Sequence, residues 1–416
     1  MKNDSYPEIR FKGFNDAWEQ RKLGKLGTFK NGMNFSKEAM DKGFPFVNLQ
    51  NIFGRNVIDV NNLGLAEASV TQLNEYNLKK GDVLFVRSSV KLEGIGEAAV
   101  VPQDLDNTTY SGFVIRFRDD TGMDNNFKRF IFGTDLVRDQ IMSKATNSAN
   151  KNISQEVLTN LMLYVPTKSE QKKIGAFFSN LDDLITLHQR KYEKLKNIKQ
   201  SMLEKMFPKN GEKFPEIRFK GFTDAWEQRK VTELGEIYIG LVTTMTSHYT
   251  DHGTLLIRNS DIKDAKFEFG DNPIYLDDEF AKKNASRKHR VGDVITVHTG
   301  DIGTSAVITE KEAGSIGFAT IVTRPNTSVV TSDFLCTYLN TDNHKNFAMN
   351  ISTGDGRNNY NLKDYYECVV PVPPNINEQI KISSFIGRIN NLITLHQRKH
   401  EKLKNIKQSM LEKMFI

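Results

Sequence analysis

Four short motifs in this sequence contain residue types that catalysis or cofactor binding requires. The stretch Asp271-Asn272-Pro273-Ile274-Tyr275 is similar to the Asn-Pro-Pro-Tyr motif of adenine methyltransferases but lacks its second proline. No helix is predicted after Gly94-Ile95-Gly96, so a turn between strands explains it better than a cofactor loop. The triplets 261–263 and 264–266 have the acid-x-Lys spacing of nucleases, which is common by chance. We therefore expect none of the four to be catalytic.

Metal and nucleotide sites have equally little support. His248 and His252 lie four residues apart, but no third ligand accompanies them. The two cysteines, Cys336 and Cys368, are interpreted as buried apolar residues of a reduced protein. The chain has no Gly-x-x-x-x-Gly-Lys-Ser/Thr phosphate loop. These observations predict a non-catalytic chain that holds no metal or cofactor.

Composition places the chain among globular proteins. Of its 416 residues, 38% are hydrophobic and 26% are charged, and the length suggests two or three domains. No segment approaches the roughly 18 apolar residues that span a bilayer. The N-terminal residues lack the apolar core of a signal peptide. We expect a cytoplasmic protein that does not associate with membranes.

Two segments of the sequence occur twice, each time 208 residues apart. Residues 7–22 and 215–230 differ at one position in sixteen, and residues 185–207 and 393–415 differ at one position in twenty-three. Such a repeat decides the organisation of the whole chain. The chain is two half-proteins in tandem, each ordered as a short lead-in, a variable block and a long helical segment.

The variable blocks have diverged but keep landmarks at similar places. Both contain a Gly-Asp-Val run, at 81–83 and 292–294, and both end with Val-Pro ahead of Glu-Gln, at 170–171 and 378–379. We expect one fold that carries two different surfaces. The predicted segments are the lead-in 1–22, the first block 23–169, the first long helix 170–207, the linker and second lead-in 208–230, the second block 231–377 and the second long helix 378–416.

Within the blocks, short β-rich runs alternate with Gly, Asn and Asp turns. The predicted strands are 82–86, 113–118, 293–298 and 320–323, and helices are predicted near 127–144 and 332–349. The expected fold class is α+β, with a mixed α/β domain built around a twisted sheet in each block.

The long segments have the pattern of paired helices. Apolar residues recur at heptad spacing, from Ile174 and Leu181 to Leu195 and Met202, and the second copy repeats them. Heptads sustained over this length predict a coiled coil. Two nearly identical helices pair most simply with each other, and an antiparallel pair gives the chain a pseudo-twofold internal repeat.

The net charge of +6 is unevenly distributed. Residues 170–230 and 378–416 carry +5 each, whereas the second block carries −6. The positive charge therefore lies on the repeated segments. This distribution is compatible with nucleic-acid binding but does not require it.

Several motifs occur in the same order in both halves. They are the lead-in Pro-Glu-Ile-Arg-Phe-Lys-Gly-Phe with Trp18 or Trp226, the Gly-Asp-Val runs, and Glu-Gln-x-x-Ile at the start of each long helix. The first block adds the polar runs 31–37 and 46–52, whereas the second departs from that form at 238–244. This order resembles that of type I restriction-modification DNA-specificity (S) subunits, over essentially the whole chain.

The resemblance implies DNA recognition without catalysis. Each block would be a target-recognition domain that contacts one half of a bipartite site in double-stranded DNA, and the paired helices would set the spacing. The implied partners are two methyltransferase (modification) subunits, which dock on the helices, and two motor-nuclease (restriction) subunits. S-adenosylmethionine, ATP and Mg²⁺ are implied for those partners alone, which methylate adenine and restrict DNA.

Base recognition needs amide, hydroxyl and guanidinium groups at groove edges, and such residues cluster near predicted strand ends. In the first block the candidate DNA-binding residues are Lys30, Asn31, Asn34, Ser36, Lys37, Asn48, Gln50, Asn51, Arg87, Ser88, Ser89 and Lys91. In the second block they are Thr243, Thr244, Thr246, Ser247, His248, Arg258, Asn259, Ser260, His298, Thr299, Arg357 and Asn358. The basic run 287–290 is either a set of phosphate contacts or a charged turn.

Two other classes of function are open at this point. A single-chain modification or restriction enzyme would need the cofactor and phosphate motifs that are missing. A coiled-coil adaptor that recognises protein would have the same helical frame. Methyl transfer by the chain alone would favour the enzyme, and failure to select a bipartite DNA motif would favour the adaptor.

Overall fold

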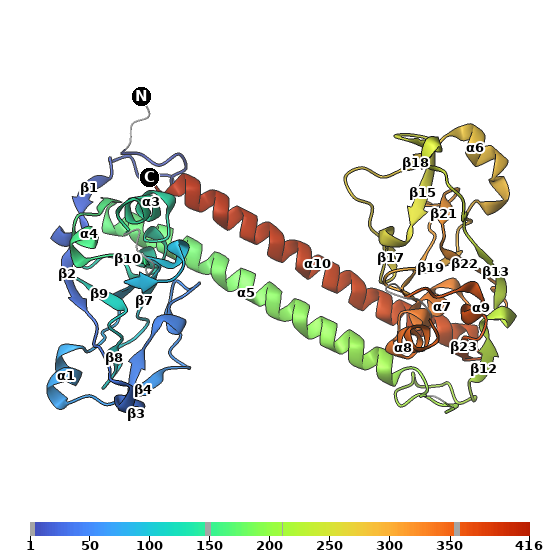
Figure 1. Cartoon of the computed structure of the whole chain (residues 1–416), viewed down its shortest axis with the longest axis horizontal. Coiled ribbons are helices and arrows are strands. Elements are labelled where there is room, and N and C mark those ends of the chain that lie inside the picture. The colour runs from blue at the N-terminus through green and yellow to red at the C-terminus, as the bar shows by residue number, and fades with distance from the viewer. Residues whose placement is uncertain (1–4, 146–150, 210, 353–357) are drawn as a thin grey trace. The chain divides into compact units, whose positions relative to one another are not determined.

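The computed structural model describes residues 5–145, 151–209, 211–352 and 358–416. Residues that lie close together in space group into two compact units (Figure 1). Unit 1 comprises residues 1–189 and 398–416, and unit 2 comprises residues 190–397. Adding 208 to the numbers of residues 1–189, and subtracting 208 from those of residues 398–416, gives the bounds of unit 2. Each unit therefore contains one block, the first part of one long helix and the last part of the other.

The first block is built on two small sheets. In the larger sheet all neighbours are antiparallel, and the order is β2 (Gly27–Asn31), β9 (Val114–Asp119), β5 (Val83–Val86) and β7 (Ala98–Val100). The smaller sheet has the order β4 (Gly64–Ala66), β3 (Met40–Val47) and β8 (Thr109–Tyr110). The helices are α1 (Val70–Glu75), α2 (Asn125–Ile131), α3 (Asp135–Lys144) and α4 (Gln155–Thr159).

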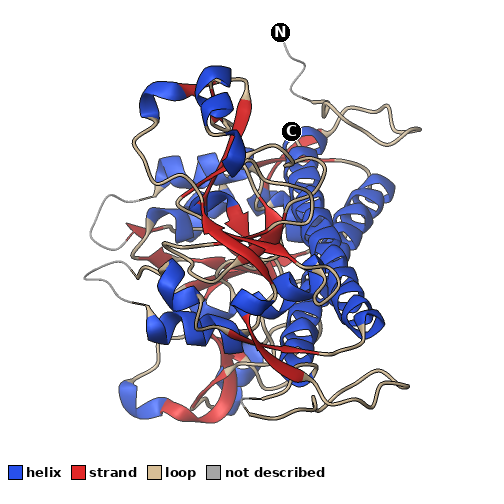
Figure 2. Ribbon diagram, turned by 90° about the vertical axis from the view of Figure 1, so that its right-hand side faces the viewer, coloured by secondary structure: helices blue, strands red, loops and turns tan. Residues whose placement is uncertain are grey.

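The second block repeats the larger sheet, with the order β13 (Gly235–Ile239), β22 (Ile321–Pro325), β19 (Val294–Thr296) and β20 (Ser305–Val307), again antiparallel. A further sheet has the order β14 (Tyr249–Thr250), β18 (Tyr275–Leu276), β15 (Thr254–Arg258) and β21 (Ile316–Phe318), and β16 (Ile262–Lys263) pairs with β17 (Lys266–Phe267). The helices are α6 (Asp278–Lys283), α7 (Ser332–Leu339), α8 (Asp342–Ile351) and α9 (Leu362–Tyr365). Figure 2 shows strands interspersed with helices. The shared sheet confirms one fold with two surfaces.

The lead-ins join each block to its long helix. Strand β1 (Glu19–Lys22) pairs with β11 (Met162–Val165), just before the first long helix, and β12 (Glu227–Lys230) pairs in the same way with β23 (Val369–Val372). Ahead of β1, the Arg10 guanidinium donates to the Glu170 carboxylate at 2.7 and 2.8 Å. Arg218 donates to Glu378 at the same two distances. The repeated sequence therefore makes a repeated fork of charge-assisted bonds.

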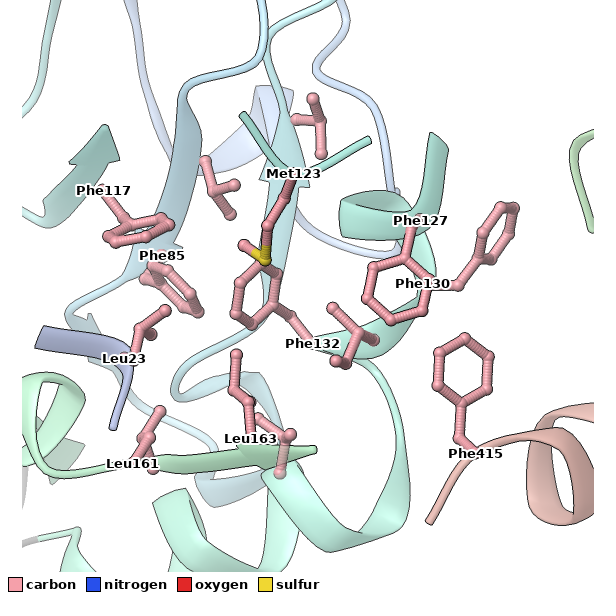
Figure 3. Packing of buried hydrophobic residues seen from close by; sticks show 14 of the residues in the cluster. Leu23, Phe85, Phe117, Met123, Phe127, Phe130, Phe132, Leu161, Leu163 and Phe415 are labelled. Atoms are coloured by element: carbon pink, nitrogen blue, oxygen red, sulfur yellow. The ribbon is translucent and has the colours of Figure 1, made fainter. Parts of the chain in front are cut away.

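The long helices are α5 (Lys168–Lys205) and α10 (Ile376–Met414). In unit 1, Phe178 of α5 packs on Phe415, and Asp182 lies 2.5 Å from Lys407 of α10. Residue numbers rise along one helix where they fall along the other, so the pairing is antiparallel, as predicted. Figure 3 shows Phe415 pointing toward Phe127 in the core of the first block.

The second unit closes its core with the end of the other helix. Phe207, just beyond α5, packs against Trp226 and Phe334, at ring-centroid distances of 5.9 and 5.5 Å. In unit 1 Phe415 packs in the same way against Trp18 and Phe127, at 6.2 and 5.5 Å. Each block therefore buries aromatic side chains from its lead-in and from the end of a long helix.

Most elements predicted from the sequence are present, with three corrections. Both long helices begin and end two residues earlier than expected. The segment 127–144 is two helices, because Gly133 and Thr134 separate α2 from α3, and 332–349 is likewise divided where Thr341 caps α8 by accepting a bond from the His344 amide. Each block contains more than one sheet. Among the described residues, no helix is both long and apolar enough to cross a membrane.

The forks between lead-in and helix give a prediction for stability. The Glu170 side chain is fully buried and Arg10 is 13% exposed, so Glu170→Ala leaves a largely buried guanidinium without its carboxylate. We expect a loss of about 3–5 kcal/mol in the free energy of unfolding, measured by urea denaturation. Glu19→Ala is the control, because it breaks an exposed pair with Arg21 and should cost less than about 1 kcal/mol. Equal losses would show that the buried fork does not matter.

Candidate nucleic-acid interface

Strand β5 and its counterpart β19 carry the same type of ion pair at one end. Arg118 binds Asp82 with bonds of 2.8 and 2.6 Å, and Arg324 binds Asp293 with bonds of 2.9 and 2.8 Å. Both carboxylates are buried. This end of the sheet belongs to the shared frame, so differences in recognition are expected at the other end.

At the other end of β5, polar groups of the first block converge. Arg87 donates to the Gly112 carbonyl at 3.3 Å. A methyl group on Gly112 would lie 2.0 Å from Asn34 Oδ1, so Asn34 also reaches this point. Ser88 and Ser89 form β6, which pairs with β10 (Lys151–Asn152). The structure therefore brings Asn34, Arg87 and the two serines to one edge.

A hollow of about 600 Å³ opens beside these residues. Phe53, Val90 and Phe113 form its apolar wall, and all three side chains are exposed. Ser88, Ser89 and Lys91 supply hydroxyl and ammonium groups to the same lining. The arrangement offers both hydrogen-bond donors and apolar contact, which are the two means by which side chains distinguish base edges.

The equivalent end of β19 is built differently. The His298 amide donates to Asn259 Oδ1 at 2.8 Å, and Thr299 Oγ1 donates to Asn359 Oδ1 at 2.9 Å. Burial lowers the pKa of His298, which favours a neutral imidazole that both donates and accepts. Asn259, His298 and Thr299 therefore form one cluster, as Arg87 and Ser88 do in the first block.

Several candidates lie on exposed loops where a duplex has access. Their side chains are exposed, although Ser260 donates to Asp261 Oδ1 at 3.4 Å and Asn358 donates to Met349 Sδ at 3.6 Å. In the first block they are Ser36, Lys37, Gln50 and Lys91, and in the second block Thr243, Thr244, Thr246, Ser247, Ser260 and Asn358.

Other candidates are already bound within their own domain. Lys30 pairs with Glu75 at 3.1 Å and lies over the Tyr76 ring. His248 bonds Asp277 at 2.7 Å and stacks on Phe280, and Arg258 forks onto Asp261 at 3.0 and 2.8 Å. Contact with DNA would have to compete with these bonds.

Two further candidates of the first block, Asn31 and Asn48, differ in the hydrogen bonds of their side chains. The side-chain oxygen Oδ1 of Asn31 is buried and has no hydrogen-bond partner among the described residues. Asn48 accepts a bond from the Leu49 amide at 2.8 Å and so caps a short 3₁₀ turn. Asn31 Oδ1 is therefore covered by the domain, whereas Asn48 is largely a structural cap.

Two interpretations need correction. Asn51 is only 1% exposed, and its amide group bonds the backbone at Asn48, Asp59 and Asn62, so we remove it from the candidate set. His289, in the basic run 287–290, is buried and bonds Ser315 Oγ, so it cannot hold a phosphate. Arg357 lies outside the described residues.

Sequence reasoning missed the aromatic wall formed by Phe53 and Phe113. An aromatic residue beside a strand is normally predicted to be core, and no pattern in the sequence marks these two as exposed.

The described residues contain no group of three or more metal-ligating side chains. His248 and His252 instead bond separate carboxylates, Asp277 and Asp251. Cys336 and Cys368 are free and buried, as predicted.

Comparison with known families matches type I restriction modification DNA specificity domains at residues 15–197 and again at 223–405. The chain belongs to this family. It is therefore a specificity subunit with two DNA-recognition domains, and it is not an enzyme.

Relatives and solved structures agree with the family. A Methanocaldococcus jannaschii protein provisionally named as the MjaX type I restriction enzyme specificity subunit is 23% identical, over 99% of this chain and 95% of its own. The EcoKI specificity subunit of Escherichia coli is 24% identical over 44% of this chain and 40% of its own. The S subunit crystal structure from M. genitalium has a TM-score of 0.61 at 14% identity and covers 99% of each chain, which supports the same fold.

Buried histidines give the specificity subunit a pH dependence that is confined to its second block, since the first block has no histidine. Burial lowers the pKa of His289 and of His344 to about 4, from the ordinary histidine value of 6.5. Between these values the unfolded chain binds protons that the folded chain does not, so stability falls as the pH is lowered through this window.

We expect the thermal unfolding midpoint to drop between pH 7.5 and pH 4.5, and to drop less in His289→Gln or His344→Gln. The substitutions themselves lower the midpoint at pH 7.5, so the compared quantity is the difference between the two pH values. His252→Gln is the control, because that side chain is exposed. An unchanged pH difference in both core variants would contradict the assignment.

Proposed function

We propose that this chain recognises a bipartite DNA site, one half with each block, and so directs adenine methylation and restriction by partner subunits. The observation that carries this is the contrast along one strand. Asp82 and Asp293 make the same ion pair at one end, whereas Arg87 and His298 differ at the other. We call these differing ends the reading edges: Asn34, Arg87, Ser88 and Ser89 in the first block, and Asn259, His298 and Thr299 in the second. A shared geometry with two different reading edges is what an asymmetric site requires.

The partners in this proposal are double-stranded DNA, two modification subunits and two restriction subunits, which assemble with the chain in the cytoplasm. S-adenosylmethionine, ATP and Mg²⁺ belong to those partners. Two identical docking partners are supported by the helices themselves. Leu184 and Leu187 of α5 are 42% and 43% exposed, and their repeats Leu392 and Leu395 of α10 are 43% and 44% exposed. Exposed leucines at repeated positions offer the same apolar surface twice.

Exchange of a block tests whether each block recognises one half-site. Replacing residues 23–169 with the block of another specificity subunit should change one half-site and leave the other intact, because the frame contacts lie outside the reading edge. Methylome sequencing of cells that express the chain with its modification subunits measures both halves. A change in both halves would contradict the assignment of one half-site to each block.

The purified chain alone should transfer no methyl groups, and methyl transfer by the chain alone would favour an enzyme.

The docking surfaces give a further prediction. Leu184→Asp with Leu187→Asp places charge on one exposed apolar surface, and we expect the complex with the modification subunit to fall from two copies to one. Native mass spectrometry measures the ratio. The matched variant Leu392→Asp with Leu395→Asp should have the same effect. Thr186→Asp, between the two leucines and also exposed, tests whether charge alone is responsible.

A further inference from the structure

The place where each block meets the long helices carries different charges in the two units. In unit 1 the centre is Asp182 of α5. It accepts bonds from Lys407 at 2.5 Å and from Asn56 at 3.1 Å, and it lies 3.5 Å from the Arg129 guanidinium of α2. Asp182 and Arg129 are 20% and 18% exposed. One carboxylate thus joins both long helices to the first block.

Unit 2 has no carboxylate at the equivalent helix position. The repeat places Asn390 where unit 1 has Asp182. Lys199, the repeat of Lys407, pairs instead with Asp264, which belongs to the second block and lies in the turn between β16 and β17. The lysine is the same in both helices, but its acid comes from a helix in one unit and from the block in the other.

The residue that faces this position from the block changes together with it. The capping residues Asp124 and Thr331 align α2 with α7, and this alignment places Cys336 where the first block has Arg129. Cys336 is buried and uncharged. The first block therefore presents a cation to an aspartate, whereas in unit 2 the neutral groups of Cys336 and Asn390 line one hollow of about 500 Å³ together with Lys199, Asp264 and Arg388.

The residues of the two pairs, Asp182 with Arg129 and Asn390 with Cys336, are not interchangeable. An asparagine beside Arg129 would remove the acid from a mostly buried guanidinium and leave it with the neutral partners Asn126 and Ser179. An aspartate beside Cys336 would compete with Asp264 for Lys199 and so loosen the contact between the turn and the helix. The near-identity of the two helices ends where this matching is needed, since residues 185–207 and 393–415 differ at one position, whereas Asp182 and Asn390 lie just outside them.

We infer that residues 182 and 390 are positioning residues that match each long helix to the block it carries. The first block requires an aspartate there, and the second requires a neutral residue. The inference rests on the proposed function, because the quantity that is positioned is a DNA-reading edge. It predicts that blocks cannot be moved freely between the two positions of one chain without changing this residue.

The test uses the full chain with its modification subunits. In the parent chain, Asp182→Asn should lower affinity about tenfold for duplexes that carry the first block's half-site, because a charged bond to the helix is lost. Affinity for the other half-site should not change. Asp183→Asn is the matched control, since it removes the same charge one residue later from an exposed side chain that the repeat also replaces with asparagine.

A chimera supplies the rescue. In a chain whose residues 231–377 are replaced by residues 23–169, the second copy of Arg129 faces Asn390 and Lys199, and Asp264 is gone. Adding Asn390→Asp should raise affinity for a duplex with two identical half-sites about tenfold. The same substitution in the parent chain should not raise affinity.

Three results would overturn the inference. Asn390→Asp could fail to improve the chimera, it could improve the parent equally, or Asp183→Asn could match Asp182→Asn. Failure of the proposed function is distinguishable, because then no variant selects any DNA. In that case thermal unfolding decides the inference, since Asn390→Asp should raise the midpoint of the chimera and not of the parent.

Discussion

A buried pair of guanidinium and carboxylate, made once in each unit, is the contact on which the architecture depends. Glu170 and Glu378 are fully buried, and a carboxylate at such a place must keep its partner. Release of Arg10 or Arg218 would leave a charge in an apolar core. This constraint accounts for the arginine of the lead-in and the glutamate of the long helix, which recur in both halves of the chain.

The glutamine that follows each of these glutamates extends the same constraint into the block. Gln171 accepts a bond from the Asp124 amide and donates to the Pro166 carbonyl, so it fixes the start of α2 against the start of α5. Gln379 makes the equivalent bonds to Thr331 and Pro373. Two adjacent buried side chains thereby set where the helix begins, where the lead-in lies and how the block attaches.

The ends of the chain show how little of this depends on covalent connection. In unit 2 the chain passes continuously from α5 into the second lead-in, and the Ile217 amide donates to the Lys205 carbonyl at 2.8 Å. In unit 1 the corresponding partners are the two ends of the chain, yet the Ile9 amide donates to the Lys413 carbonyl at 2.9 Å. The same backbone bond therefore forms in both units, whether or not the two segments follow one another along the chain.

The sequence predicts the frame well because the frame is periodic or repeated. Heptads, Gly-Asp-Val strands and the 208-residue repeat all have a spacing that can be counted. The reading edge has no such period. Asn51 and Gln50 are neighbours of similar polarity, yet one is buried in a capping turn and the other is exposed. Tertiary bonds decide which of the two faces solvent, and those bonds join residues that are not adjacent in sequence.

In the proposed function, specificity can change because the conserved ion pairs and the candidate DNA-binding groups lie at opposite ends of the same strand. The ion pairs of Asp82 and Asp293 hold β5 and β19 at one end, and they contribute nothing to the groups at the other. Substitutions at Arg87 to Lys91, or at His298 and Thr299, therefore leave the buried charges of Asp82 and Asp293 paired. The second block is acidic overall, so contacts with phosphates would have to come from local basic groups and not from the charge of the whole block.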